Sequence, residues 1–159
     1  MKDAQYYIDA FDMQAHPEGG YYKRTLASTD ETTTKSGVRS LYSSIYFLLR
    51  SGEVSHFHRL KSDEIWFYHT GSPLTLHIIS PDGVYSEIQL GLEAAKGESP
   101  QVMVPKHSIF GCSVNDPNTF GLVSCVVSPG FVFEDFEMFS QAQLLALYPQ
   151  YEDMIRKLA

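Results

Sequence analysis

The feature that most constrains the fold is a succession of short strand patterns, one about every ten residues. From Ser40 onward, runs of alternating or β-branched residues are separated by turn residues, with no helical pattern between them. They predict a first strand from Ser40 and further strands near 54–58, 64–70, 74–80, 84–90, 101–104, 109–114, 120–128 and 131–136. Many short strands without intervening helices are typical of a β-sandwich or β-barrel and not of a parallel α/β sheet.

Helical periodicity is confined to the two ends of the chain. Apolar residues at helical spacing predict a short helix over residues 3–11, followed by a strand at 21–26 and a polar surface loop at 28–37. Ser140 and Gln143 match a capping box, and the helical spacing continues to Leu158 with a break at Pro149. We therefore expect C-terminal helices over about 140–158, packed against the outside of the β structure.

Length and charge limit the classes of function. A chain of 159 residues predicts a single domain over 1–159, and a net charge of −7 without a Lys or Arg run argues against a nucleic-acid partner. No apolar stretch is long enough for a signal peptide or a membrane span, so we expect a cytoplasmic protein without a membrane partner. Cys112 and Cys125 lack CxxC spacing and are expected to be reduced core thiols.

Polar residues gather in the segment 56–66. Alternation along a strand predicts that His56 and His58 share one face, and the returning strand places Glu64 opposite them. Two imidazoles and a carboxylate are a donor set that suits a divalent metal such as Fe, Mn, Ni or Zn. The same residues also suit a metal-free site, in which His58 and Glu64 exchange protons and Tyr68 acts as an acid.

Other residues are candidates for binding a ligand in the same interior. Glu18 precedes two glycines in a tight turn, from which its carboxylate either closes a cavity or stays exposed. Arg24 offers a bidentate partner for a phosphate or carboxylate. Aromatic residues that form either a wall of the cavity or ordinary core are Tyr46, Trp66, Phe110 and Phe131.

Several phrases of the chain, taken together, resemble the cupin superfamily. Gly52, the pair His56 and His58, Glu64 and Gly71 resemble its first motif, although with different spacing. Gly97 and Pro105 resemble the start of its second motif, in which His107 stands where a turn glycine is expected and Phe110 where the last metal ligand is expected. A closer resemblance, to the DUF985 or Cupin_5 subfamily, rests on the segments 17–21, 44–48, 57–66, 100–105, 129–131 and 144–149.

The resemblance implies a double-stranded β-helix, a jelly-roll-like barrel, in a family with no firmly assigned activity and a homodimeric state. It leaves three functions open. One is a metal-independent epimerase or isomerase acting on a sugar or nucleotide-sugar ligand, and the second is a metal-dependent dioxygenase or isomerase that uses His56, His58 and Glu64. The third is a module that binds a small molecule without turnover. Fold analogy alone does not choose among them.

Overall fold

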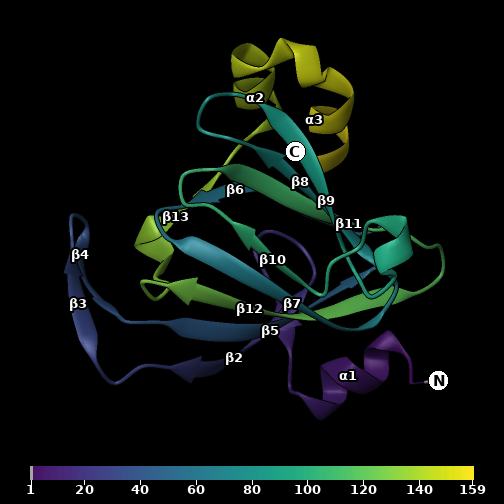
Figure 1. The fold of residues 1–159 in the computed structure, drawn as a ribbon, viewed down its shortest axis with the longest axis horizontal. Coiled ribbons are helices and arrows are strands. Elements are labelled where there is room, and N and C mark those ends of the chain that lie inside the picture. Colours follow the sequence, from purple (N-terminus) through teal and green to yellow (C-terminus); the bar gives the residue numbers. More distant parts are fainter. Residues whose placement is uncertain (1) are drawn as a thin grey trace.

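The computed structural model describes residues 2–159, which form two antiparallel sheets packed face to face (Figure 1). The predicted all-β architecture is thereby confirmed. One sheet has, in spatial order, β1 (Gln14–Ala15), β2 (Tyr21–Ala27), β5 (Ser43–Arg50), β12 (Phe120–Ser128), β7 (Asp63–Gly71) and β10 (Gln101–Val104). The other sheet has β13 (Phe136–Met138), β6 (Val54–Leu60), β11 (Ile109–Val114), β8 (Leu74–Ile79) and β9 (Tyr85–Leu90).

Successive strands alternate between the two sheets over most of the chain. From β5 to β8, and again from β10 to β13, each strand lies in the sheet opposite to its predecessor. The link between β9 and β10 contains a short 3-10 turn, η1 (Ala94–Lys96). This connectivity wraps the chain around one interior, as in a jelly roll, and brings segments distant in sequence to the same wall.

Large apolar side chains fill the space between the sheets. The core cluster includes Phe47, Trp66, Leu76, Phe110 and Val123, each at most 1% exposed. Their alternation with outward residues accounts for the strand pattern of the sequence, because one face of each strand lies in the core.

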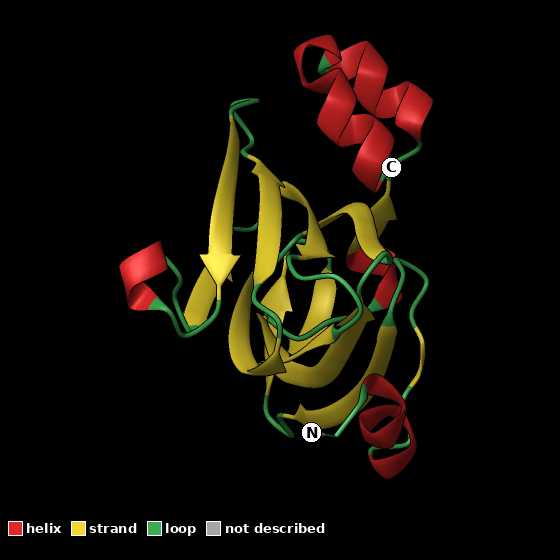
Figure 2. Ribbon diagram, turned by 90° about the vertical axis from the view of Figure 1, so that its right-hand side faces the viewer, coloured by secondary structure: helices red, strands yellow, loops and turns green. Residues whose placement is uncertain are grey.

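Short helices cover two ends of the barrel (Figure 2). The N-terminal helix α1 (Ala4–Ala10) packs over β5, whereas α2 (Gln141–Leu147), the 3-10 turn η3 (Pro149–Tyr151) and α3 (Glu152–Leu158) lie at the other end. The predicted capping box is confirmed, since Ser140 and Gln143 exchange side-chain and backbone hydrogen bonds. None of the helices within residues 2–159 is long and apolar enough to cross a membrane.

Two segments differ from the prediction. The expected loop at 28–37 is wrong, because β3 (Glu31–Thr34) and β4 (Gly37–Ser40) form a hairpin that projects from one side of the barrel (Figure 1). The β-branched threonines of β3 favour a strand, and Gly37 adopts the positive φ of 118° that its turn requires. The expected strand at 131–136 is instead the 3-10 turn η2 (Phe133–Asp135), followed by β13.

Candidate functional site

A cavity of about 200 Å³ opens between the two sheets. Its walls are mainly apolar and include the rings of Phe47, Phe131 and Phe136. The buried polar residues in its lining are Glu18, Ser43, Ser44, His58 and Glu64. Such a combination of apolar walls and a few convergent polar groups is typical of a small-molecule site.

The register of the six-stranded sheet places one wall of this cavity. Side chains directly opposite each other on neighbouring strands point to the same face, so in-register residues form rows across the sheet. Two such rows line the cavity: Arg24, Ile45 and Cys125 form one, and Ser43, Val127 and Glu64 form the other. Arg24 and Glu64 thus enter the cavity from strands β2 and β7, which are separated by β5 and β12.

A β-bulge shapes the opposite wall. Two residues of β6, His56 and Phe57, lie opposite the single residue Gly111 of β11. A Cβ atom on Gly111 would come within 2.6 Å of the Ser55 carbonyl oxygen, so the close approach of the two strands requires glycine. The extra residue interrupts the alternation of inward and outward side chains in the middle of β6.

The bulge separates the two histidines that were expected to share a face. Ser55 and His58, three positions apart, both turn towards Glu18: Ser55 Oγ donates to Glu18 Oε1 at 3.0 Å, and His58 Nε2 lies 3.1 Å from Glu18 Oε2. His56 turns to the backbone instead, where its Nδ1 lies 2.7 Å from the Glu18 carbonyl oxygen. His56 does not line the cavity.

The turn at Glu18 is held against β6. The His56 backbone N–H also donates to the Glu18 carbonyl oxygen at 2.7 Å. Gly19, with φ 112°, allows the close contact, because a Cβ atom there would lie 2.1 Å from the Val54 carbonyl oxygen. Of the two positions expected for Glu18, the structure shows the buried one, with the residue only 6% exposed.

The contact between Glu18 and His58 depends on where their protons lie. His58 Nδ1 lies 2.7 Å from the His56 carbonyl oxygen, which can only accept, so Nδ1 carries a hydrogen. Neutral His58 therefore presents an acceptor at Nε2, and an ionised Glu18 would present another. Burial lowers the pKa of His58 to about 4, and burial also raises the pKa of the Glu18 carboxyl. Both shifts favour the uncharged forms, and the 3.1 Å contact is favourable when one proton lies between the two atoms.

Glu64 is a second buried acid in the same lining. Burial, with the neighbouring Glu18 carboxyl as the second cause, raises the pKa of the Glu64 carboxyl to about 8, so it is protonated at neutral pH. Its Oε2 atom has no hydrogen-bond partner among the described residues, and the residue is 6% exposed. A buried oxygen without a partner, on a residue that lines a cavity, is a candidate position for a hydrogen bond to a ligand.

The other predicted site residues have different positions. Arg24 and Phe131 line the cavity, whereas Tyr68 donates its hydroxyl to the Gly71 carbonyl oxygen and Tyr46 packs on Phe11, the C-cap residue of α1.

Trp66 and Phe110 belong to the apolar core instead of the cavity lining. The Phe110 ring lies with its centroid 4.2 Å from that of His58, where it supports the imidazole from behind. It therefore acts on the site only through His58.

The donor atoms do not fit a metal site. Within residues 2–159, no group of three or more His, Cys, Asp or Glu side chains is arranged to hold a metal ion. His56 is engaged with the Glu18 backbone, and the partner of His58 Nε2 is a carboxyl, so the expected set of His56, His58 and Glu64 does not converge. We therefore derive no step through a metal.

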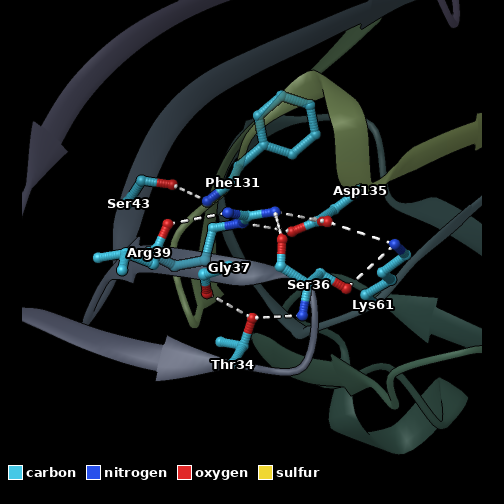
Figure 3. A network of polar contacts seen from close by, with 9 residues as sticks. Thr34, Ser36, Gly37, Arg39, Ser43, Lys61, Phe131 and Asp135 are labelled. Atoms are coloured by element: carbon cyan, nitrogen blue, oxygen red, sulfur yellow. Dashed lines mark hydrogen bonds and ion pairs between the residues drawn. The ribbon is translucent and has the colours of Figure 1, made fainter.

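One side of the cavity mouth is held by an ion-pair network (Figure 3). The Arg39 guanidinium of β4 contacts both carboxylate oxygens of Asp135 at 2.8 and 3.0 Å, which lowers the pKa of that carboxyl. Lys61 lies 3.6 Å from the same carboxylate, and Ser43 Oγ accepts from the Phe131 N–H at 2.8 Å. The network fixes the aromatic segment at 131–136 over the cavity.

Residues outside the predicted set also reach the site. His16 lines the cavity and accepts the Glu18 N–H at Nδ1, 3.1 Å away. Its place two residues before Glu18, in the same turn, was the available signal. No pattern in the sequence indicated Ser55, because the inward direction of its side chain depends on the bulge.

Comparison with known proteins decides the family. Residues 5–139 match the family described as Cupin superfamily (DUF985). The chain belongs to this family. It is 31% identical over 147 residues to the uncharacterized protein YML079W of Saccharomyces cerevisiae, a match that covers 82% of this chain and 72% of that protein.

Solved structures agree with this membership. Protein SO0799 from Shewanella oneidensis has 50% identity and a TM-score of 0.93, with 100% of this chain and 98% of that one covered. A hypothetical protein from Leishmania major has 42% identity and a TM-score of 0.94, with 99% of both chains covered. A variant of the Bacillus subtilis oxalate decarboxylase OxdC shares the fold alone, with 12% identity, a TM-score of 0.60, and 92% of this chain but 37% of that one covered.

The departures of this cupin from the usual second motif have structural counterparts. His107 adopts the positive φ of 68° at the position where the motif has a turn glycine. Phe110 places a ring against His58 where the motif has a ligand. At this position the metal ligand of the motif is replaced by an aromatic ring that packs on His58.

Proposed function

We propose that this cupin binds a small molecule in the cavity and moves a proton on it, as an isomerase or epimerase does. The observation that supports the proposal is the contact between Glu18 Oε2 and His58 Nε2 at 3.1 Å, in a cavity that Glu64 also lines. The Glu18 and His58 pair and the single acid Glu64 would thus both contact a molecule bound in the cavity. Placing an acid and a base on one substrate is the basis of general acid–base catalysis.

The pair supplies a proton acceptor. When a Glu18 oxygen takes a proton from a carbon of the ligand, the proton already on that carboxyl passes to His58 Nε2, and the imidazole becomes a cation. Nδ1 of His58 keeps its hydrogen bond to the His56 carbonyl oxygen, which orients the ring during the transfer. Return of a proton to another position or another face of the ligand restores the pair and completes an isomerisation.

Glu64 supplies the complementary donor. A protonated carboxyl in an apolar cavity donates a hydrogen bond to a ligand carbonyl oxygen and stabilises the negative charge that develops on it. The Oε2 atom of Glu64 has no hydrogen-bond partner of its own among the described residues, which supports this role. Chemistry of this kind requires a substrate with an acidic C–H next to a carbonyl group.

The test is hydrogen exchange on bound carbonyl compounds. A panel is incubated with the protein in D₂O, and proton NMR follows the loss of signal from the carbon beside the carbonyl. We expect exchange for the wild type and a loss of about a hundredfold or more for Glu64→Leu, which removes the hydrogen-bond donor to the ligand carbonyl oxygen. Tyr68→Phe is the control and is expected to exchange like the wild type, since its hydroxyl binds Gly71.

The alternative is a binding module without turnover. Saturable binding by compounds of the panel, with no exchange or isomerised product for any of them, would refute proton transfer and support this alternative.

A further inference from the structure

The size of the cavity limits its ligand to a single ring. About 150 Å³ is enough for benzene in an apolar cavity, and drug-sized ligands occupy about 300–1,000 Å³. The cavity here measures about 200 Å³, which suits one six-membered ring with short substituents. A complete nucleotide sugar is too large, and only its sugar ring would enter.

The walls favour a ring with few polar groups. Apolar side chains from both sheets and from the segment 131–136 surround the space: Ile45, Phe47, Leu60, Val127, Phe131 and Phe136. A sugar ring carries several hydroxyl groups, and each one buried without a partner costs about 1–3 kcal/mol. Two wall hydroxyls have part of their capacity taken, since Ser43 Oγ accepts the Phe131 N–H and Tyr22 OH accepts from Gln14 at 3.0 Å, so each offers a sugar mainly its single O–H donor.

Polar groups mark the two ends of the space. The closed end holds Glu64, whose Oε2 atom lacks a partner, beside the buried Glu18 and His58 pair. At the exposed end, Arg24 is the one Lys or Arg side chain in the lining as far as the described residues show, and no ion pair engages it there. A carboxylate is the smallest anionic group that a guanidinium binds bidentately.

The sheet register fixes the separation of these ends. Arg24 of β2 lies in register with Trp66 of β7, which follows Glu64 by two positions. The two strands are three interstrand steps of about 4.8 Å apart, so the Arg24 and Trp66 backbones are separated by roughly 14 Å. The Arg24 and Glu64 side chains reach inward from both sides and take up part of this distance. The remaining gap is on the scale of one ring with substituents at opposite positions.

We propose that the cavity takes a monocyclic oxo acid, with its ring between the apolar walls, its carbonyl oxygen at Glu64 and its carboxylate at Arg24. This inference rests on the proposed function for the role of the carbonyl group, and on the cavity alone for size and charge. The reaction on such a ligand is removal of a proton from the ring carbon beside the carbonyl by the Glu18 and His58 pair, and its return at the same or another carbon. No oxidant or further reactant is required.

Binding of 4-oxocyclohexane-1-carboxylate tests the ligand class. Isothermal titration calorimetry compares it with cyclohexanone, which lacks the carboxylate, with cyclohexanecarboxylate, which lacks the carbonyl group, and with glucose and UDP-glucose. We expect the oxo acid to bind best. Arg24→Gln should weaken the oxo acid by about tenfold to a hundredfold and leave cyclohexanone unchanged. Arg59→Gln is the matched control, since Arg59 pairs with Glu137 outside the cavity.

The outcomes separate this inference from the proposed function. If the oxo acid binds through Arg24 but its ring protons do not exchange in D₂O, the ligand class stands and the proton transfer is refuted. If glucose or UDP-glucose binds more tightly than every monocyclic acid, or if Arg24→Gln has no effect on the oxo acid, the ligand class is overturned. Exchange on another carbonyl compound would then still support proton transfer.

Discussion

Two buried histidines of this protein, His58 and His77, differ in what surrounds them. Each is 2% exposed, and burial lowers the pKa of each to about 4. His77 contacts two hydroxyl groups, Tyr85 OH at Nδ1 and Ser113 Oγ at Nε2, and does not line the cavity between the sheets. His58 contacts the buried Glu18 carboxyl beside a cavity, whereas the carboxylate near His77, Glu87 at 3.6 Å, is exposed. A shifted pKa is therefore common to both regions, and the burial of the carboxyl partner and the open space distinguish a candidate site from structure.

The largest expected difference is in proton transfer. Glu18→Gln removes the carboxyl that contacts His58, so deuterium exchange on a bound carbonyl compound should fall by about a hundredfold to ten-thousandfold. Glu87→Gln is the matched change near His77, where Glu87 accepts from Tyr85 OH at 2.6 Å, and exchange should stay within about twofold of the wild type. Similar losses in both variants would show that the two regions do not differ in the way described.

The next effect concerns stability against pH. Glu64 has a pKa of about 8 in the folded protein against 4.5 ordinarily, so the folded state holds a proton that the unfolded chain loses first. Its contribution to the free energy of unfolding is therefore complete below about pH 4.5 and is lost as the pH rises to about 8. Glu64→Gln should gain on the wild type between pH 5 and pH 8 by up to a few kcal/mol in urea unfolding. A constant difference across this range would contradict the raised pKa.

The smallest expected effect is at the structural histidine. His77→Phe leaves the buried Ser113 hydroxyl without its partner, whereas Tyr85 OH keeps Glu87, and it should lower the free energy of unfolding by about 1–3 kcal/mol. Deuterium exchange per folded molecule should not change. A loss of exchange without a loss of stability would assign His77 to the active region and remove the contrast with His58.

The local part of the fold could be predicted from the sequence. Strands 101–104, 109–114 and 120–128 match β10, β11 and β12, because one face of each strand is buried and the alternation is visible without any partner. The Ser140 capping box is equally local. The hairpin β3–β4 was missed, because its polar composition resembles a loop and its Arg39 contact lies with Asp135, 96 positions away.

The site was less predictable because its residues meet across the fold. His58 and Glu64 belong to one recognisable segment, and both line the cavity. Glu18 could be proposed only as one of two alternatives, since its partner His58 lies forty positions further along the chain. His56 and Tyr68 fitted the alternation of their strands but contact backbone carbonyl groups. Nothing local in the sequence indicates these contacts.

The bulge in β6 has a consequence for how sequences of related chains are compared. Side chains before and after it follow opposite phases of the two-residue repeat, so Ser55 and His58 reach Glu18 from the same strand. Removal of one residue between them would exchange the inner and outer faces of the first half of the strand while keeping every other letter of the motif. Two relatives with the same two histidines can therefore have different interiors, and the length of this segment and the glycine opposite it carry information that the histidines alone do not.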